Sequence, residues 1–324
     1  MVSVIVVAFA GENYIRKCLD SLTRQSCRYL DIIVVDNSAK PDIERLIQRS
    51  YPAVRLFVQE KNIFYGPALN IGIKQGSAEY ILCLNDDVVL DDSFVEKALR
   101  GFSVDKKIGM VSGKILRSDR ATIDSTGLFL SAWASPLERG YGKKDNGQFD
   151  KEGFIFGVSG AAAFYRRKML DGIKEGGSYF DTDFAMFYED LDIAWRALRA
   201  GWKGYYIPDA VAYHSRGAST RPDNTGKKFA RLYIDDTLQM HLVKNRYLAI
   251  IKNISLSNLL LRLPFLAFYD FFLWVYILIF RPKAAKLFLA NVNSLRNALR
   301  KRFSVGEKRK QTVAQAQKSL DTSG

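Results

Sequence analysis

The sequence predicts an α/β protein built on a mostly parallel sheet, followed by a helical C-terminal region. Continuous apolar, β-branched runs such as Val2–Phe9 and Asp31–Val35 are typical of strands buried on both faces of a parallel sheet. Stretches with apolar residues at helical spacing alternate with these runs, and polar residues follow directly after them. Open parallel sheets place their ligand sites at those strand ends, so the pattern also predicts where a site should lie.

The first 85 residues alternate regularly between strand and helix. After the first strand, Ile15, Cys18, Leu19 and Leu22 recur at helical spacing. In chain order, the pattern predicts strands at Val2–Phe9, Asp31–Val35, Val54–Val58 and Tyr80–Leu84, and helices at Asn13–Gln25, Ile43–Arg49 and Pro67–Gln75. This βαβαβαβ order is the arrangement from which parallel sheets are built.

The middle of the chain is less regular. The pattern predicts strands at Gly109–Ile115, Gly157–Tyr165, Lys203–Ile207 and Ala210–His214, a helix at Phe187–Gly201, and a mobile loop rich in Gly, Lys and Asp at Ser131–Gly153. Beyond Arg221 the pattern is helical. We therefore expect a domain at 1–220, a basic and hydrophobic helical region at 221–305 and a disordered tail at 306–324.

The net charge of +14 is concentrated near the C-terminus. Residues 221–324 carry 19 Lys and Arg against 6 Asp and Glu, whereas residues 1–220 carry 29 against 28. Because these basic residues flank aromatic and aliphatic runs, they indicate an anionic membrane surface as the partner rather than nucleic acid.

The three cysteines and the N-terminus indicate a cytoplasmic protein. Cys18, Cys27 and Cys83 have no metal-ligand spacing, and they are interpreted as reduced thiols. The apolar stretch Met1–Ala10 lacks the basic segment of a signal peptide. We expect the protein to bind peripherally to the inner face of the plasma membrane.

Leu263–Phe280 is long and apolar enough to be considered as a membrane span. Asp270 near its middle would cost about 3 kcal/mol at the bilayer centre. A single span would also export the basic residues that follow, against the positive-inside rule. An interfacial or shallow re-entrant helix pair keeps them on the cytoplasmic side and suits Trp274 and Tyr276. A helical subdomain packed on the sheet is the alternative.

Two acidic clusters follow predicted strands. Asn85-Asp86-Asp87 comes after the fourth strand and offers the hard oxygen ligands that suit Mg²⁺ or Mn²⁺. Asp36 comes after the second strand, where its carboxylate can accept hydrogen bonds from a pyrimidine or a ribose. Asp and Asn are also common turn formers and helix caps, which is the alternative for each cluster taken alone.

A third acidic cluster begins a predicted helix. Glu189, Asp190 and Asp192 follow Phe184, Phe187 and Tyr188, a setting in which a partly buried carboxylate can act as a base. Acids in a first helical turn also favour the helix dipole, which is the structural alternative. His214 ends a predicted strand and is a candidate metal ligand.

These motifs together resemble family 2 glycosyltransferases of the GT-A fold, closest to the bacterial rhamnosyltransferase-like branch. The motifs cover about residues 2–217. Each motif alone is a weak indication of the family, whereas the whole set in this order is a specific one. They read Val34-Val35-Asp36-Asn37-Ser38, Asn62-x-x-x-Gly66-x-x-x-Asn70-x-Gly72, Leu84-Asn85-Asp86-Asp87, Gly157-x-x-Gly160-Ala161, Phe187-x-Glu189-Asp190-x-Asp192-x-x-x-Arg196-x-x-x-x-Gly201 and His214.

The resemblance implies an inverting, metal-dependent enzyme that moves a sugar from a nucleoside-diphosphate sugar to a lipid-linked or glycan acceptor in cell-envelope synthesis. It implies Asp190 as the catalytic base, Asp87 and His214 as ligands of Mg²⁺ or Mn²⁺, and Glu189, Asp192 and Arg196 as acceptor or supporting residues. The implied donor-binding residues are Ala8, Asp36, Asn62, Asn70, Asn85 and Asp86. Asn85 departs from the first Asp of the family's DxD motif. That form is common in the rhamnosyltransferase-like branch, so L-rhamnose is a candidate sugar.

Three rival functions share some of these features. A dehydrogenase would need a Gly fingerprint after the first strand, where the chain reads Ala8-Phe9-Ala10-Gly11. A sugar nucleotidyltransferase would need a Gly-rich, basic first loop, which this chain lacks. A non-catalytic, membrane-docked sugar-nucleotide binding protein would keep the donor residues without a need for Asp190.

Overall fold

A computed structural model describes residues 1–9, 11–216 and 235–302. The chain divides into two compact units, one made of 1–131 with 135–234 and the other of 132–134 with 235–324. The predicted boundaries at 220/221 and 305/306, and the predicted disordered tail at 306–324, lie outside the described residues.

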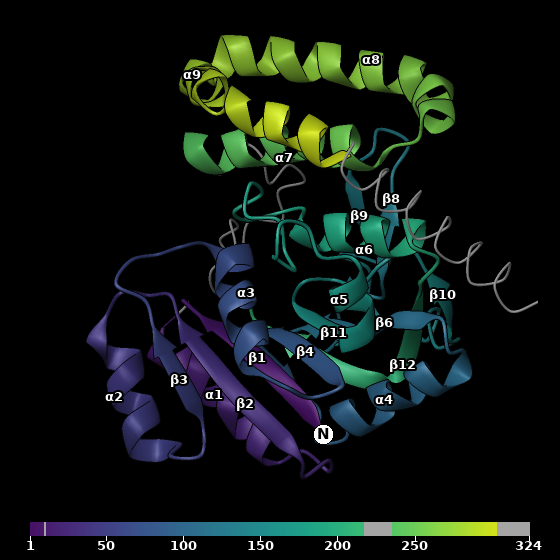
Figure 1. Ribbon diagram of the computed structural model, residues 1–324. Coiled ribbons are helices and arrows are strands. Elements are labelled where there is room, and N and C mark those ends of the chain that lie inside the picture. Colours follow the sequence, from purple (N-terminus) through teal and green to yellow (C-terminus); the bar gives the residue numbers. More distant parts are fainter. Residues whose placement is uncertain (10, 217–234, 303–324) are drawn as a thin grey trace, which may run out of the picture. The chain divides into compact units, whose positions relative to one another are not determined.

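The first unit is built on one mixed sheet in which β1 lies between β4 and β2 (Figure 1). Its hydrogen-bonded order is β10-β12-β6-β11-β4-β1-β2-β3, with β5 and β7 pairing to β12 and β6. The strands are β1 Val2–Ala8, β2 Leu30–Asp36, β3 Arg55–Val58, β4 Tyr80–Asn85, β5 Val88–Leu90, β6 Ile108–Arg117, β7 Ile123–Ser125, β10 Gly153–Ile155, β11 Ala162–Arg166 and β12 Lys203–His214. Strands β1 to β4 run parallel, and β11 pairs antiparallel with β4 and β6.

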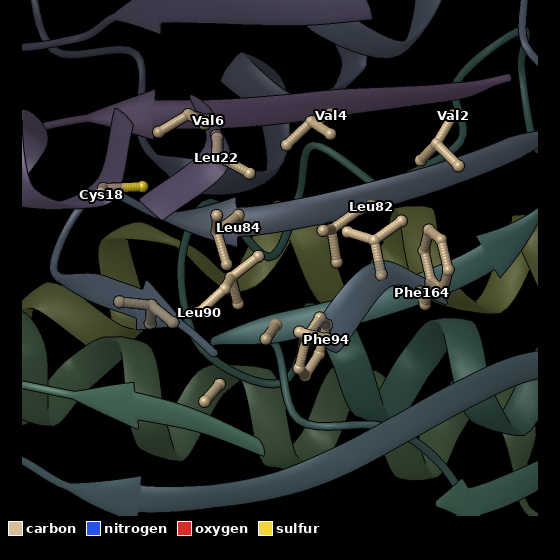
Figure 2. Close-up of a cluster of buried hydrophobic side chains, with 14 of the residues drawn as sticks. Val2, Val4, Val6, Cys18, Leu22, Leu82, Leu84, Leu90, Phe94 and Phe164 are labelled. Atoms are coloured by element: carbon tan, nitrogen blue, oxygen red, sulfur yellow. The ribbon is translucent and has the colours of Figure 1, made fainter. Parts of the chain in front are cut away.

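Helices cover both faces of this sheet. They are α1 Glu12–Thr23, α2 Pro41–Ser50, α3 Tyr65–Gln75, α4 Phe94–Val104, α5 Arg167–Gly172 and α6 Glu189–Arg199. Val2, Val4 and Val6 of β1 point into a core that contains residues of α1, α2 and α4, and Figure 2 shows part of it. Ile5 and Val7 point into the opposite core, formed with α3, α5 and α6. The strand is therefore buried on both faces, as its apolar run predicts.

The strand order places three strand ends beside one another. From β1 the chain proceeds to β2 on one side and later reaches β4 on the other, so β1 lies at a switch point of the sheet. Ala8 pairs in register with Asp36, and Val7 pairs with Asn85. The carboxyl ends that carry Asp36 and Asn85-Asp86-Asp87 therefore meet at one edge.

The segment predicted as a mobile loop, Ser131–Gly153, is largely fixed by hydrogen bonds. It contains β9 (Pro136–Glu138), which pairs with β8 (Leu128–Leu130). Lys114 is buried and forms ion pairs with Asp145, at 2.8 Å, and with Asp150. Composition suggested mobility, but composition does not reveal the pairing with β8 or the ion pairs with Lys114 of β6.

Two strand predictions differ in detail from the structure. Of the predicted strand Gly157–Tyr165, only the second half forms β11, because the chain makes a turn from Ser159 to Ala162. The predicted strands Lys203–Ile207 and Ala210–His214 are one strand, β12, with a register shift between Ile207 and Val211.

The second unit is helical, as the sequence predicts. It contains α7 Asp236–Asn253, α8 Leu256–Phe280 and α9 Pro282–Ala290, and residues 292–302 are helical too. Asp235 and Ser255 cap α7 and α8 through their side chains. Leu273 and Ile277 of α8 pack with Val243 of α7 and with Ala285 of α9.

Asp270, the acid within the apolar helix α8, is paired. It forms an ion pair with Arg246 of α7, and the Arg246 guanidinium also lies 4.6 Å from the ring of Tyr269. Arg246 Nε donates to the carbonyl of Trp133 at 2.9 Å, and the Trp133 ring stacks on Tyr269. The acid therefore lies on the packed side of α8 rather than on its outer face.

The outer face of α8 is apolar and exposed. Within the described residues, α8 is the one helix long and apolar enough to cross a membrane by length and composition. Its exposed side chains are Leu256, Leu260, Leu261, Leu263, Phe265, Phe268, Phe271, Phe272, Val275, Leu278, Ile279 and Phe280. A contiguous apolar face of this kind marks a membrane or partner surface.

Candidate active site

A cleft of about 310 Å³ lies at the edge where β1, β2 and β4 end. Val7 and Phe9 flank the end of β1, and the residues that begin α6 form part of its wall. Seven predicted site residues line it: Asn62, Asn85, Asp86, Asp87, Glu189, Asp190 and His214. The structure thus brings together motifs that lie more than 150 residues apart in the sequence.

On the donor side, two asparagines fix the shape of the cleft. Asn37 Nδ2 donates to Asn62 Oδ1 at 2.9 Å, and Asn37 Oδ1 accepts from the N–H of Ile63 at 2.8 Å. The backbone N–H of Phe64 also donates to Asn62 Oδ1. Asn62 is therefore held in place from the end of β2.

Asp36 is fully buried beneath this pair and is not a wall residue. Its Oδ1 accepts from the N–H of Ser38 at 2.9 Å, whereas its Oδ2 has no hydrogen-bond partner among the residues that the structure describes. A buried carboxylate oxygen without a partner is costly, so a hydrogen-bond donor of a ligand that reached Asp36 Oδ2 would be stabilised there.

Asp86 and Asp87 point to different partners at the end of β4. Asp86 Oδ2 accepts from the N–H of Phe9 at 2.6 Å, which ties the end of β1 to this cluster. Asp87 Oδ1 lies 3.2 Å from His214 Nε2. Both aspartates are nearly buried.

His214 lies between two carboxylates. Its Nδ1 lies 2.8 Å from Asp124 Oδ2, on the side opposite Asp87. Burial by itself lowers the pKa of His214, but the hydrogen bonds with Asp124 and Asp87 outweigh burial and raise the pKa to about 9. Burial raises the pKa of Asp124, yet the hydrogen bond with His214 and the charge of Arg216 leave it below its usual value.

The Asp87 and His214 pair fits one edge of a divalent-metal site. Neighbouring ligands of an octahedral ion with bonds of about 2.1 Å lie about 3 Å apart, close to the 3.2 Å between Asp87 Oδ1 and His214 Nε2. A metal ion would displace the proton that His214 Nε2 directs at Asp87, while the Asp124 carboxylate accepts the Nδ1 proton, as outer carboxylates do in many metal sites. In the part of the chain that the structure describes, no three His, Cys, Asp or Glu side chains could hold an ion by themselves. A ligand's phosphates would have to complete the site.

Asp190 reaches the cleft from the first turn of α6. Its Oδ2 accepts from the N–H of Gly160 at 3.1 Å, and its Oδ1 accepts from the N–H of Leu191 at 2.7 Å. Burial raises the pKa of Asp190, although these backbone hydrogen bonds oppose the rise. A carboxylate with a raised pKa is a stronger base than an exposed one.

Glu189 lines the same cleft and is more deeply buried. Its Oε2 is buried and has no hydrogen-bond partner within the described part of the chain. Burial, and then the charge of Asp190, raise the pKa of Glu189 well above its ordinary value. The two neighbouring carboxyls therefore do not ionise independently.

The backbone around the cleft is strained. Phe64, Ala185, Phe187 and Tyr188 have φ values of 67°, 60°, 67° and 68°, in the left-handed region. Each such residue costs about 1–3 kcal/mol, and strain of this kind concentrates at functional sites. Phe64 and Phe187 also line the cleft, so the strained backbone directly shapes its wall.

The other predicted site residues lie outside the wall. Asn70 holds the 179–180 segment, because its Nδ2 donates to Phe180 O and its Oδ1 accepts from the N–H groups of Tyr179 and Phe180. Asp192 and Arg196 form a buried ion pair at 2.8 Å, and Arg196 also donates to two backbone carbonyls. Ala8 contributes its carbonyl, which accepts from Asn37 N.

Several residues that line the cleft were not among the predicted site residues, and four of them carry polar or charged groups that matter for the site. They are Asn37, Asp124, Ser159 and Arg216, all of which line the cleft. Asn37 follows Asp36 in the motif Val34-Val35-Asp36-Asn37-Ser38, so its position in that motif could have indicated a site residue. Arg216 follows His214, and its Nε donates to Asp124 Oδ1 at 2.6 Å. Asp124 lies in a three-residue strand with no motif around it.

Comparison with known proteins identifies the family. Residues 3–173 match the family described as glycosyl transferase family 2. The chain belongs to this family. It is therefore a glycosyltransferase, as the sequence motifs predict.

Similar proteins include a rhamnosyltransferase and a synthase of poly-N-acetylglucosamine. The chain is 25% identical over 248 residues to an N-acetylglucosaminyl-diphospho-decaprenol L-rhamnosyltransferase of Mycobacterium tuberculosis, covering 68% of this chain and 78% of the relative. It is 23% identical over 214 residues to a poly-beta-1,6-N-acetyl-D-glucosamine synthase of Staphylococcus epidermidis, covering 65% of this chain and 49% of that protein.

Similar solved structures confirm the GT-A fold. Staphylococcus aureus TarS, residues 1–349, aligns with a TM-score of 0.55 at 14% identity, covering 92% of this chain and 80% of that one. The mannosyltransferase PcManGT of Pyrobaculum calidifontis, solved with GDP-Man and Mn²⁺, aligns with a TM-score of 0.53 at 17% identity. The alignment covers 99% of this chain and 83% of that one.

Proposed function

We propose that this glycosyltransferase moves a sugar from a nucleoside-diphosphate sugar to a lipid-linked or glycan acceptor, with inversion at the anomeric carbon and with Asp190 as the base. One observation carries the proposal. Asp190, fixed by the N–H of Gly160, opens into the same cleft as Asp87 and His214. One wall thus offers a base for the acceptor, and the other offers groups for the diphosphate.

Asp190 takes the proton of the attacking hydroxyl. An acceptor oxygen that attacks the anomeric carbon loses its proton as the bond forms, and a positioned carboxylate accelerates such a step by about 10²–10⁴-fold. Attack from the face opposite the leaving diphosphate gives inversion. The hydrogen bonds from the N–H groups of Gly160 and Leu191 leave the Asp190 carboxylate little freedom to turn away from the acceptor.

Asp87 and His214 would hold the divalent ion, Mg²⁺ or Mn²⁺. The ion supplies neutralisation of the charge that develops on the departing diphosphate. Asp124 keeps the His214 ring oriented through Nδ1. The similar structure solved with GDP-Man and Mn²⁺ supports this part by analogy of fold.

The donor's base and ribose would lie toward Asp36 and Asn62. Asp36 Oδ2 is the buried acceptor without a partner, and Asn62 is held by Asn37. L-Rhamnose is the first sugar to test, because the mycobacterial relative is named as an L-rhamnosyltransferase. That relative's name also supports a polyprenyl-diphosphate-linked acceptor.

The second unit would lie against the inner face of the plasma membrane. Its helix α8 exposes an apolar face, and basic residues such as Arg281, Lys283 and Lys286 follow directly. Such a combination favours an anionic lipid surface, where each basic residue contributes about 1 kcal/mol. A lipid-linked acceptor would meet the enzyme at that surface.

A donor screen tests the proposal. The purified protein is mixed with single nucleotide-sugars and Mn²⁺, and thermal stabilisation identifies the donor. Transfer to a short lipid-linked acceptor is then followed by NMR of the new glycosidic bond. We expect one nucleotide-sugar to stabilise the protein and the product to have inverted anomeric configuration. A retained configuration, or pyrophosphorolysis without transfer, would contradict the proposal.

A further inference from the structure

Tyr65 is a residue of the cleft wall to which the proposed mechanism gives no role. It begins α3, directly after Phe64, whose backbone lies in the left-handed region at a φ of 67°. The N–H of Phe64 donates to Asn62 Oδ1 at 2.8 Å, and the N–H of Gly66 donates to the carbonyl of Ala185 at 3.1 Å. Hydrogen bonds on both sides therefore fix the backbone that carries the Tyr65 side chain.

The Tyr65 hydroxyl binds the turn that contacts the proposed base. It donates to the carbonyl of Gly160 at 2.9 Å, and the N–H of the same Gly160 donates to Asp190 Oδ2 at 3.1 Å. Glycine has no side chain that restricts its backbone, so its hydrogen-bond partners determine how Gly160 is held. Each step from Tyr65 to Asp190 is thus a direct hydrogen bond.

We infer that Tyr65 is a positioning residue for Asp190: its hydroxyl holds Gly160 and thereby the N–H that orients the carboxylate. The inference rests on the proposed function, since it assigns Tyr65 a role through the base. Tyr65 neither takes nor gives a proton in this role. The start of α3, which follows Asn62 on the donor side of the cleft, then also supports the base.

Burial keeps the Tyr65 hydroxyl in the state that this role needs. It raises the pKa of Tyr65 well above the usual value, so the hydroxyl keeps its proton and remains a donor at neutral pH. Phenylalanine has the same ring without the hydroxyl. Tyr65→Phe therefore removes the hydrogen bond to Gly160 and leaves the packing of the ring in place.

Kinetics of Tyr65→Phe give the first test. The kcat should fall about 5-fold or more, because a small misplacement of a catalytic group is costly. The KM values for donor and acceptor should stay within about twofold, since the hydroxyl binds the turn rather than a substrate. Tyr29→Phe is the matched control, because the Tyr29 side chain is exposed, and it should leave kcat unchanged.

The pH dependence of kcat gives a second readout, which a purely structural role of Tyr65 would not change. Burial raises the pKa of Asp190, and the hydrogen bond from Gly160 opposes that rise. A loosened Gly160 in Tyr65→Phe lets the pKa of Asp190 rise further, while the neighbouring carboxyl of Glu189 is the same in both proteins. As the solution is made more acidic, the kcat of the variant should therefore fall at a higher pH than that of the wild type.

A double-mutant cycle with Asp190→Asn shows whether Tyr65 acts through the base. If it does, Tyr65→Phe should change kcat less than twofold when Asp190→Asn is already present, because no base remains to be oriented. Wild-type kcat in Tyr65→Phe would overturn the inference. Equal losses in the presence and absence of Asp190, or a loss confined to the KM for the donor, would overturn it too. Full activity of Asp190→Asn alone would instead contradict the proposed function, and Tyr65 would then have no base to position.

Discussion

The backbone N–H of Gly160 donates to Asp190 Oδ2 at 3.1 Å, so a turn before β11 holds the acid that begins α6. Packing against α6 explains the first glycine of the Gly157-x-x-Gly160 motif. A Cβ on Gly157 would lie 2.4 Å from the Cβ of Ala194, so this position lets the chain lie directly on α6. A Cβ on Gly160 would lie 3.4 Å from Asp190 Oδ2.

Gly157→Ala should therefore displace α6. Overpacking of this kind costs about 1–3 kcal/mol, and we expect a loss of that size in the free energy of unfolding together with lower transfer activity. Gly153→Ala is the matched control, because a Cβ there meets nothing within 4 Å. Urea unfolding of both variants measures the difference. Equal stability of the two variants would refute the packing argument.

Asp124→Asn tests the orientation of His214. An amide oxygen is a weaker acceptor for the Nδ1 proton than the carboxylate, which lies 2.8 Å from Nδ1 in the wild type. Loss of such an outer partner typically weakens metal binding about 10–100-fold. Titration of Mn²⁺ in the presence of donor, followed by calorimetry, measures the affinity. Asp92→Asn, an exposed change in the same unit, serves as control. An unchanged Mn²⁺ affinity in Asp124→Asn would mean that His214 is not a ligand.

Glu189→Gln tests the buried acid pair by its pH dependence. Because the pKa of Glu189 is raised in the folded protein, the folded state binds a proton that the unfolded state releases. This bound proton adds to the free energy of unfolding below the ordinary pKa of a glutamate. The contribution is lost as the pH rises through the raised pKa of Glu189. Glutamine does not titrate, so the Glu189→Gln variant does not suffer this loss. The free energy of unfolding of the variant, compared with that of the wild type, should therefore increase from pH 5 to pH 8.5.

We expect that gain to be at least about 1 kcal/mol, since one unit of pKa corresponds to about 1.4 kcal/mol. Urea unfolding at pH 5 and at pH 8.5 measures it. Glu60→Gln, at an exposed position, should show no such gain. A Glu189→Gln variant whose stability parallels the wild type at both pH values would argue against a buried, protonated acid.

Much of the fold was predictable because it depends on local patterns. The apolar run of β1 predicted burial on both faces, and Ile15, Cys18 and Leu19 predicted the buried face of α1. The ends of β2 and β4 could be placed at one edge because parallel strands share a direction. Asp36 and Asp87 were found for this reason.

The contacts that depend on distant pairing were not predictable. Asp124 lies 90 positions before its partner His214, and a three-residue strand has no periodicity to reveal it. Glu138 lies in a segment whose composition indicated a mobile loop, whereas the pairing of β9 with β8 and the hydrogen bond from Ser125 to Glu138 fix it. Asn70 matched a motif but proves to hold the 179–180 segment, since a motif does not tell a wall residue from a support.

Membrane binding should depend on the outer face of α8. Phe268→Ser with Phe271→Ser changes two exposed rings, and full burial of one such ring is worth about 1.5–3 kcal/mol. We expect at least about a 10-fold loss of binding to vesicles that contain anionic lipid. Val104→Ser with Phe154→Ser, exposed residues of the first unit, should have no effect.

High salt or alkaline carbonate should also release much of the wild-type protein, because screening acts over about 8 Å at physiological salt and less at higher salt. Retention of the protein through carbonate extraction would show instead that α8 spans the bilayer.

The rate of transfer by Asp190→Asn tests the central claim most directly. Asparagine keeps the shape of the side chain and can still accept from the N–H of Gly160, but it cannot take the acceptor's proton. We predict that kcat falls about 100-fold or more while donor affinity changes little. Donor affinity is measured by calorimetry and transfer by product formation on the same preparation. Transfer at the wild-type rate would contradict the assignment of Asp190 as the base. An equal loss of donor binding and transfer would contradict it too, and would place Asp190 among the groups that hold the donor and its metal.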